Sequence, residues 1–532
     1  MPKPEGVVPL DFQSQKKFDF NNLFTFEMAN NHQGSVEHGK RIINAIAEIA
    51  ERMGVRAAIK FQFRDLDTLI HPDHRTKSNN KHISRFLSTE LKEEDFAVLV
   101  HEAECRGLIT MATPFDEPSV DRLVRLNVAV AKIASCSALD WPLLERVAEI
   151  GKPVICSTGG LTISEIDRIV SFFQHRGIHF ALMHCVAMYP TPNGKLHLNQ
   201  IELMRNRYPG IVIGFSTHED PANTSAVKLA YAKGARLFEK HVGVPTETIV
   251  LNAYSANPTQ VEAWLAAWRE AVDACGGDEE REISSVELVD LHSLRRGVYL
   301  KKAVRQGTSL KRSDVFFAMP LAGGQLSSGS WKEKLIADRD YEAGASIADV
   351  VLPQERSKKE IIYSVIHAVK GMLNMNKIPL GHDFLVELSH HYGIERFHEV
   401  GCTLIECINR EYAKKLIIQL PGQMNPVHYH KKKDETFQLL TGELEVEIDG
   451  RRRTLYPGDT LWVPRGVWHG FRTSIGAIFE EVSTASFNDD SFYLDKAIAN
   501  MARDGRKTNL YNWGRHQFDE FDAAGNVVNQ YL

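Results

Sequence analysis

The chain has 532 residues, a length that predicts two to four domains at about 100–200 residues per domain. Its 63 Lys and Arg residues nearly balance 68 Asp and Glu residues, so the net charge of −5 offers no global field for nucleic acid or an anionic membrane. No run of apolar residues reaches the length of a transmembrane helix, and the first twenty residues do not resemble a secretory signal. We therefore expect a soluble, cytoplasmic protein, whose seven scattered cysteines, none in a CxxC pair, are reduced and buried.

Residues 21–280 alternate short apolar runs with longer amphipathic stretches whose apolar residues lie three and four apart, as in helices. The runs expected to be strands are 23–29, 57–63, 108–115, 128–135, 153–159, 180–187, 212–218 and 236–243. Eight buried strands separated by helices favour a (β/α)8 TIM barrel. An open doubly wound sheet is the alternative, although no GxGxxG motif follows the first strand.

The rest of the chain is expected to form smaller segments around a polar linker near 276–285. They are an N-terminal arm (1–20), a region of short strands and turns with little helix (286–352), a helical connector (353–396), a small β-barrel (397–487), and a helix with a polar tail (488–532).

Polar residues gather where the eight predicted strands end, which is where TIM barrels carry their active sites. They are Glu27, Lys60, Gln62, Thr113, Lys132, Ser135, Ser157, Tyr189, Ser216, His218, Glu239 and His241. The two lysines and the hydroxyl groups are what a phosphate and a carboxylate need for binding. His218 and His241, on neighbouring strands, can hold one divalent ion, for which imidazoles favour Mn²⁺ over Mg²⁺. Any one of these residues alone is more often structural, but all eight strands supply them.

Motifs at these strand ends resemble the sialic acid synthases, from FEMANNHQG (26–34) and IKFQ (59–62) to IGFSTH (213–218) and EKHV (239–242). The resemblance implies condensation of phosphoenolpyruvate with a sugar aldehyde to a nine-carbon 2-keto acid, with Mn or Mg as the metal and without a nucleotide cofactor. It implies three sets of site residues: Lys60, Thr113, Lys132, Ser135, Ser157 and Ser216 for phosphoenolpyruvate; His218 and His241 for the metal; Glu27, Gln62, Tyr189 and Glu239 for the sugar or the reacting centre.

Four positions depart from the family's pattern. Ala187 replaces an asparagine, Ser137 a glutamate and Met319 an arginine, while Asn252 lies near the place of an expected aspartate. Because most of these positions face the sugar, we interpret them as a changed acceptor with catalysis retained. N-acetylmannosamine, mannose and diamino-dideoxy hexoses remain open as acceptors.

Residues 286–352 resemble the antifreeze-like (SAF) domain of the same synthases, which implies a homodimer in which this domain covers the partner's active site. Arg295 and Arg296 could replace the missing arginine at Met319, although a solvated surface role is the simpler interpretation.

The last domain carries two motifs that resemble those of cupins, G-x5-H-x-H-x4-E-x6-G from Gly422 to Gly442 and G-x5-P-x-G-x2-H from Gly458 to His469. Side chains alternate along a strand, so His428 and His430 share one face, with Glu435 and His469 on adjacent strands. Three imidazoles and one carboxylate suit Zn, Fe, Mn or Ni. The alternatives are a sugar pocket without metal, an isomerase module, or a structural role.

Two other functions remain open at this stage. A Schiff-base pyruvate aldolase would use Lys60 or Lys132 as its nucleophile. A non-catalytic carbohydrate-binding protein would have lost turnover through the changes at Ala187 and Met319.

Overall fold

The computed structural model describes residues 17–75, 79–277, 280–349, 358–380, 384–487, 489–502 and 505–511. Most of the expected N-terminal arm and C-terminal tail lie outside these ranges. The chain divides into two compact units, Met1–Ser284 and Ser285–Leu532. None of the helices in the described ranges has the length and apolar character needed to span a membrane. All seven cysteines are free, but only Cys156, Cys185 and Cys402 are buried, so the expectation of buried thiols was wrong for the other four.

The first unit is a closed barrel of eight parallel strands in sequential order, which confirms the predicted TIM barrel and excludes the open sheet. The strands are β1 (Leu23–Glu27), β2 (Arg56–Phe63), β3 (Ile109–Pro114), β4 (Val130–Ile133), β5 (Val154–Ser157), β6 (Phe180–Cys185), β7 (Ile213–Thr217) and β8 (Leu237–His241). Pairing of β1 with β2 and with β8 places Glu27 level with Lys60 and His241.

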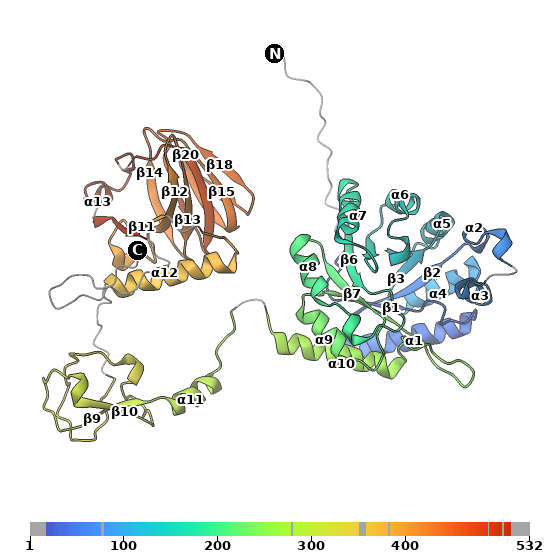
Figure 1. The fold of residues 1–532 in the computed structure, drawn as a ribbon, viewed down its shortest axis with the longest axis horizontal. Coiled ribbons are helices and arrows are strands. Elements are labelled where there is room, and N and C mark those ends of the chain that lie inside the picture. Colours follow the sequence, from blue (N-terminus) through green and yellow to red (C-terminus); the bar gives the residue numbers. More distant parts are fainter. Residues whose placement is uncertain are drawn as a thin grey trace, which may run out of the picture. The chain divides into compact units, whose positions relative to one another are not determined.

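Helices surround these strands (Figure 1). They are α1 (Val36–Met53), α2 (Leu66–Leu69), α3 (Lys81–Ser88), α4 (Glu93–Cys105), α5 (Glu117–Arg125), α6 (Trp141–Glu149), α7 (Ile163–His175), α8 (Asn199–Arg207), α9 (Ser225–Ala232) and α10 (Pro258–Cys275). Helix α1 shows why the local sequence specifies its ends. The Ser35 hydroxyl accepts the N–H of His38 at the N-terminus, and Gly54 adopts the left-handed conformation at the C-terminus.

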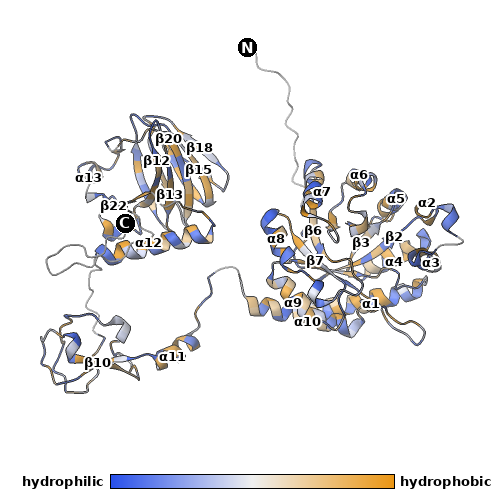
Figure 2. Cartoon of the chain, viewed as in Figure 1, coloured by the Kyte–Doolittle hydropathy of each residue, from blue (hydrophilic) through white to orange (hydrophobic). Residues whose placement is uncertain are grey.

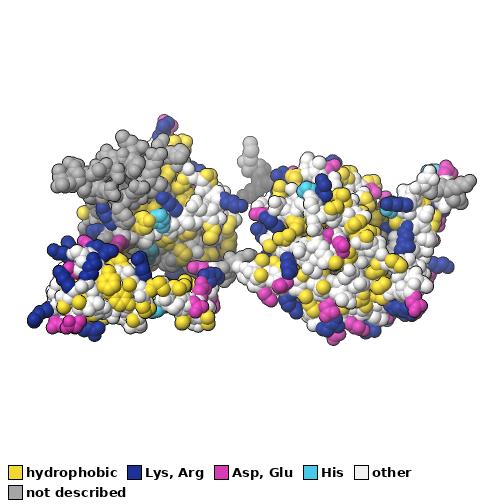
Figure 3. Space-filling model, turned by 60° about the horizontal axis from the view of Figure 1, so that its bottom comes forward, with side chains coloured by type: hydrophobic (Ala, Val, Ile, Leu, Met, Phe, Trp, Pro, Cys, Tyr) yellow, Lys and Arg dark blue, Asp and Glu magenta, His cyan; other side chains and the backbone are white. Residues whose placement is uncertain are grey.

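The interior of the barrel changes from apolar to polar along the strands. Near the amino ends, Phe20 packs with inward-facing apolar side chains that include Leu23, Met111 and Ile155. Because inward positions recur every second residue, the next inward side chains on the same strands are polar. This alternation places the inward-facing polar residues at the carboxyl ends of the strands, which is one end of the barrel. On the face shown in Figure 3, positive and negative side chains of this unit are interspersed, in keeping with the balanced composition.

The second unit begins with α11 (Ser285–Leu294), a helix in the region that was expected to contain little helix. Strands β9 (Gly297–Leu300) and β10 (Val315–Ala318) follow as an antiparallel pair. Their small core contains Val298, Leu310 and Tyr341. Met319 is exposed just after β10.

Two antiparallel sheets form the last domain (Figure 1). The larger has the order β18 (Thr460–Val463), β15 (Glu435–Gly442), β20 (Ala477–Thr484), β13 (Tyr412–Gln419), β12 (Cys402–Asn409), β11 (Leu385–Ser389) and β22 (Lys507–Tyr511). The smaller has the order β17 (Arg451–Leu455), β16 (Leu444–Ile448), β19 (His469–Arg472), β14 (Met424–Tyr429) and β21 (Phe492–Tyr493). One apolar core packs helix α12 (Lys358–Met375) against the larger sheet, and a second contains residues of both sheets. Figure 2 shows apolar residues along these strands.

The structure differs from two of the expected segments. Strand β11 lies within residues 353–396, which were expected to be helical, and it joins the larger sheet. Strands β21 and β22 lie within residues 488–532, where, in the part that the structure describes, the four-residue helix α13 (Lys496–Ala499) is all that matches the expected helix. Strands of two to five residues, such as these three, have too few alternating positions to be predicted from the sequence.

Candidate functional site

A cavity of about 1060 Å³ opens at the carboxyl ends of the barrel strands. All twelve residues that the sequence analysis singled out in the barrel line it: Glu27, Lys60, Gln62, Thr113, Lys132, Ser135, Ser157, Tyr189, Ser216, His218, Glu239 and His241. Most are buried, whereas the Tyr189 side chain at the rim is exposed. The structure therefore brings the whole predicted set together in one place.

Lys60 is the centre of this cavity's charge network. Its ammonium nitrogen lies 2.6 Å from Glu27 Oε2 and 2.8 Å from Glu239 Oε2, and all three side chains are buried. Burial raises the pKa of Glu27, even though the Lys60 charge opposes the shift. Burial would also raise the pKa of Glu239, but Lys132 and Lys60 together hold it below its usual value. Two carboxylates on one cation thus differ in their readiness to take a proton.

A second group of donors surrounds Lys132. Its ammonium nitrogen donates to Ser157 Oγ at 2.5 Å and lies 3.8 Å from Glu239 Oε2. Burial lowers the pKa of Lys132, and the Lys60 charge adds to the shift. Nearby, the hydroxyl of Ser216 donates to Glu239 Oε1 at 2.9 Å. Among the described residues, the buried hydroxyl of Thr113 has no hydrogen-bond partner.

The imidazole rings of His218 and His241 lie with their centroids 5.2 Å apart. His218 Nδ1 is 3.1 Å from the Val186 carbonyl oxygen, a contact that favours a proton on Nδ1 and leaves Nε2 as a free electron-pair donor. His241 Nδ1 is buried without a partner. Burial lowers the pKa of His218 to about 4 and that of His241 well below its usual value, so both rings are neutral near pH 7. Two neutral imidazoles with free nitrogen atoms fit a divalent metal ion.

Arg64 and Tyr254 are among the lining residues that the sequence analysis missed. Arg64 donates to Gln62 Oε1 at 2.5 Å and stacks over the Phe86 and Phe115 rings. Lys60, Gln62 and Arg64 are spaced two residues apart, so the alternation of side chains also predicts that Arg64 faces the cavity. Tyr254 packs against His241 with ring centroids 5.1 Å apart, on a loop whose sequence gave no such signal.

The positions that depart from the sialic acid synthase pattern lie in different surroundings. Ala187 lines the cavity, Ser137 is buried outside its lining, and Asn252 is exposed. Met319 belongs to the second unit.

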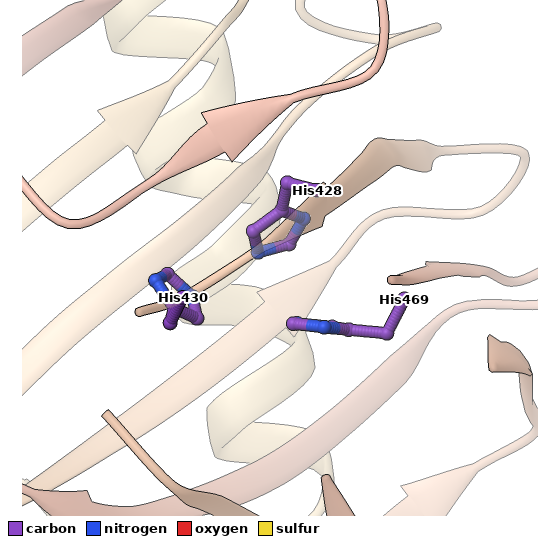
Figure 4. Close-up of side chains that lie close together, drawn as sticks. All are labelled: His428, His430 and His469. Carbon is purple, nitrogen blue, oxygen red and sulfur yellow. The ribbon is translucent and has the colours of Figure 1, made fainter. Parts of the chain in front are cut away.

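The last domain places three histidines together, as Figure 4 shows. The candidate ligand atoms of His428, His430 and His469 lie within 4.8 Å of one another, the one such cluster of three found among the described residues. Each Nδ1 lies at hydrogen-bond distance from a backbone carbonyl oxygen: Pro426 for His428 at 2.9 Å, Val467 for His469 at 3.1 Å, and Asp490 for His430. These contacts favour a proton on each Nδ1 and leave the three Nε2 atoms for a metal.

Glu435, the fourth predicted ligand, borders this cluster. One carboxylate oxygen lies 3.0 Å from His469 Nε2, and the other lies 3.4 Å from His430 Nε2. Glu435 also forms an ion pair with Lys433, which in turn lies 2.9 Å from Glu481 Oε1. Burial lowers the pKa of His430 to about 4, so its ring is neutral near pH 7. The donor set fits a transition metal ion such as Zn, Fe, Mn or Ni.

Asp490 fixes the loop that follows His430. Its carboxylate accepts the backbone N–H groups of Lys431, Lys432 and Lys433 at 2.9–3.1 Å, while its carbonyl oxygen holds His430 Nδ1. The motif's Gly442 is also explained, because it has a positive φ and an added Cβ would lie 2.0 Å from the Gly476 carbonyl oxygen.

Comparison with known proteins identifies the barrel. The NeuB family matches residues 46–280. N-acetylneuraminate-9-phosphate synthase of Drosophila melanogaster is 34% identical over 324 residues, covering 54% of this chain and 84% of that protein. The chain belongs to the NeuB family. A second member, spore coat polysaccharide biosynthesis protein SpsE of Bacillus subtilis, is 33% identical over 319 residues, covering 56% of this chain and 83% of its own length.

A solved structure supports the NeuB assignment. Spore coat polysaccharide biosynthesis protein E of Chromobacterium violaceum is 45% identical, with a TM-score of 0.58, and the match covers 62% of this chain and 98% of that one. The cupin domain matches residues 416–476. The predicted combination of a sialic acid synthase-like barrel with a C-terminal cupin is therefore confirmed.

Proposed function

We propose that this NeuB-family chain is a transferase that condenses phosphoenolpyruvate with an aldose or N-acylated amino-aldose. The products would be a nonulosonic 2-keto acid and inorganic phosphate. The observation that carries the proposal is the buried arrangement of Lys60 between Glu27 and Glu239, beside Lys132 and Ser157, in the cavity of a barrel whose relatives include N-acetylneuraminate-9-phosphate synthase. The acceptor stays open among mannosamine-type sugars, mannose and diamino-dideoxy hexoses.

In the proposed complex, cations and hydroxyl groups of the barrel bind phosphoenolpyruvate. Lys60 and Lys132 would neutralise its phosphate and carboxylate charges, and Thr113, Ser135, Ser157 and Ser216 would donate hydrogen bonds to their oxygen atoms. Gln62 and Tyr189 would contact the sugar. Because burial strengthens these electrostatic contacts, they would also stabilise negative charge that develops during the reaction.

The reaction requires one carbon–carbon bond to form and one carbon–oxygen bond to break. The enol carbon attacks the sugar aldehyde, water adds to the carbon that carries phosphate, and the tetrahedral intermediate expels inorganic phosphate to leave the keto group. Glu27, with its raised pKa, would give a proton to the aldehyde oxygen and then accept one from the attacking water. Glu239 would remain ionised and orient Lys60, Lys132 and Ser216.

We further propose that His218 and His241 hold Mn or Mg in the barrel, and that His428, His430, Glu435 and His469 hold Zn, Fe, Mn or Ni in the cupin. A metal ion at the barrel pair would supply a Lewis acid that polarises the aldehyde carbonyl group.

We also expect a homodimer through residues 286–352, which size-exclusion chromatography with light scattering would detect. Deletion of this segment should then give a monomer.

Phosphate release tests the proposed function. The full chain with Mn²⁺ should release phosphate from phosphoenolpyruvate with at least one sugar in a panel of aldoses and N-acetylhexosamines, and mass spectrometry should show the matching 2-keto acid. With ¹⁸O in the bridging position of phosphoenolpyruvate, the label should leave with the phosphate, because the carbon–oxygen bond breaks. Lys60→Ala should abolish release, whereas the matched substitution Lys228→Ala on the surface of α9 should not.

A Schiff-base aldolase is the second candidate, and the low pKa of Lys132 is the observation that favours it. Lys60 fits that role less well, because Glu239 and Glu27 raise its pKa despite burial and keep it protonated. Borohydride reduction in the presence of pyruvate should trap an adduct at Lys132 if this candidate is right. Activity that survives EDTA would also favour it over the metal-assisted condensation.

The non-catalytic alternative rests on Ala187 and Met319. It predicts that no sugar in the panel supports phosphate release. It also predicts that Lys60→Ala leaves carbohydrate binding by the chain unchanged.

A further inference from the structure

The cupin domain contains a second cavity that the proposed condensation does not use. It has a volume of about 370 Å³, within the range of small-molecule sites. His428, His430 and Glu435 line it at the metal cluster, and the rest of the lining comes from strands of both sheets and from loops such as the one that follows β20. A ligand in this cavity would therefore reach the metal centre.

The lining is rich in hydrogen-bonding side chains. His391 Nε2 lies 2.9 Å from Asn425 Oδ1 and 3.3 Å from Ser389 Oγ, so this nitrogen serves as a donor to the amide oxygen. His391 Nδ1 is then an acceptor, and it is buried without a hydrogen-bond partner among the residues that the structure describes. A ligand hydroxyl group could satisfy it. Tyr493 packs between His391 and His428, with ring centroids 5.1 Å and 5.5 Å away.

The three lysines of the lining each have a carboxylate neighbour. Lys507 pairs with Glu387 at 2.6 Å, and Lys433 pairs with Glu481 at 2.9 Å. Lys415 donates to Ser486 Oγ at 2.8 Å and lies 3.9 Å from Glu481. No lysine of this lining thus lacks a carboxylate neighbour within the described residues, and Glu406 adds a further negative charge. Apart from the metal, an anionic ligand would meet no lysine in the described lining that lacks a carboxylate neighbour, and Glu406 would repel it.

We infer that the cupin cavity binds a neutral, polyhydroxylated ligand of monosaccharide size, with oxygen atoms directed at the three-histidine metal centre. Hydroxyl groups both donate and accept, so they match a lining that offers carboxylate and imidazole acceptors beside ammonium and amide donors. An apolar ligand would leave these buried groups unpaired. The inference does not depend on the chemistry of the barrel, which binds an anion in a separate cavity.

The test uses the full chain with the barrel metal pair removed by His218→Ala and His241→Ala, and with cobalt(II) loaded at the three cupin histidines, His428, His430 and His469. The visible absorption of cobalt reports on its coordination without any need for activity. Titration with neutral D-mannose, D-xylose or D-mannitol should change this spectrum in a saturable manner for at least one probe. D-mannonate, the anionic match of mannitol, should bind at least tenfold more weakly.

Variants in the cavity locate the binding. His391→Leu should weaken the response to the best neutral probe by about tenfold or more without changing the cobalt spectrum in the absence of sugar. His398→Leu, the same substitution at an exposed position, should leave the response to the neutral probe unchanged. Asn425→Ala provides a second variant if His391→Leu fails to fold. Tighter binding of mannonate, or no spectral response to any neutral probe up to tens of millimolar, would overturn the inference.

Discussion

Glu27 and Glu239 lie on either side of one ammonium group, but their pKa values move in opposite directions. The difference arises because Glu239 lies near both Lys60 and Lys132, whereas burial dominates at Glu27. A carboxyl group with a raised pKa can carry a proton at moderate pH, and its partner can remain an anion. This asymmetry makes Glu27 the better candidate for proton transfer.

Glu27→Gln tests that assignment. We expect kcat for phosphate release to fall about 100-fold or more, because the amide cannot exchange a proton. In the unsubstituted chain, kcat should fall at high pH as Glu27 loses its proton. This fall should be absent from the pH profile of Glu27→Gln. An unchanged kcat would remove Glu27 from the mechanism. Glu27→Asp, which keeps the carboxyl group, should retain more activity than Glu27→Gln.

His32, in the loop after β1, makes the stability of the barrel depend on pH. It is buried, its Nδ1 accepts the N–H of Gly34 at 3.1 Å, and burial lowers its pKa to about 4. The unfolded chain takes up a proton near pH 6.5, and the folded chain does so only near pH 4. Stability should therefore fall as pH decreases from 6.5 to 4, by up to about 3 kcal/mol from this group.

Thermal unfolding of His32→Gln checks this dependence. Its midpoint should decrease less between pH 6.5 and pH 4 than that of the unsubstituted chain. His175→Gln, at an exposed position on α7, should leave the slope as it was. Equal slopes in all three proteins would show that His32 does not contribute.

At the scale of single elements, strand parity explains which parts of the site were predictable. Inward positions recur every second residue, so the polar residues of β1, β2 and β8 could be read from the sequence once their ends were located. Lys240 lies between Glu239 and His241 and therefore faces away from the cavity. There it pairs with Glu219 at 2.8 Å, and both side chains are buried. The alternation along β8 predicts which side of the strand Lys240 faces. It does not predict the ion-pair partner Glu219, which lies in the loop after β7.

The Lys240–Glu219 pair connects the residues next to His218 and His241, so it should position the two imidazoles. Lys240→Met leaves the Glu219 charge buried without its cation and should cost about 3–5 kcal/mol of stability. Calorimetry should show a smaller loss for the double variant Lys240→Met, Glu219→Gln. Retention of Mn²⁺ affinity in the folded double variant would contradict the positioning role.

The cupin shows where sequence patterns fail. Its histidines were predictable because they stand in motifs that resemble those of cupins, and the alternation of side chains places His428 and His430 on one strand face. Their hydrogen bonds to the carbonyl oxygens of Pro426 and Asp490 were not predictable, because the positions of these oxygens depend on the conformation of the surrounding backbone. Strand β22 was missed for a similar reason, since it is specified by its pairing with β11 across more than a hundred residues.

At the scale of the whole molecule, the two compact units should respond separately to metal. Metal bound by the cupin stabilises only the unit that contains it, by about 4 kcal/mol at a thousandfold excess over Kd. Differential scanning calorimetry should therefore show one transition that moves up on addition of Zn²⁺ to the His218→Ala, His241→Ala chain. His469→Ala should abolish this shift and leave the other transition unchanged. Movement of both transitions together would contradict independent units.

The contact between Asp490 and His430 has a consequence for the order of biosynthesis. A ribosome completes the barrel, most of the cupin strands and all three histidines before it adds Asp490, because synthesis proceeds from the N-terminus. Until then, the Asp490 carbonyl oxygen cannot hold the proton of His430 on Nδ1, and the Asp490 carboxylate cannot accept the N–H groups of the loop at Lys431. We therefore expect nascent chains that end before residue 488 to bind metal about 10–100-fold more weakly than the released protein. Acquisition of the metal would be among the last steps of this protein's maturation.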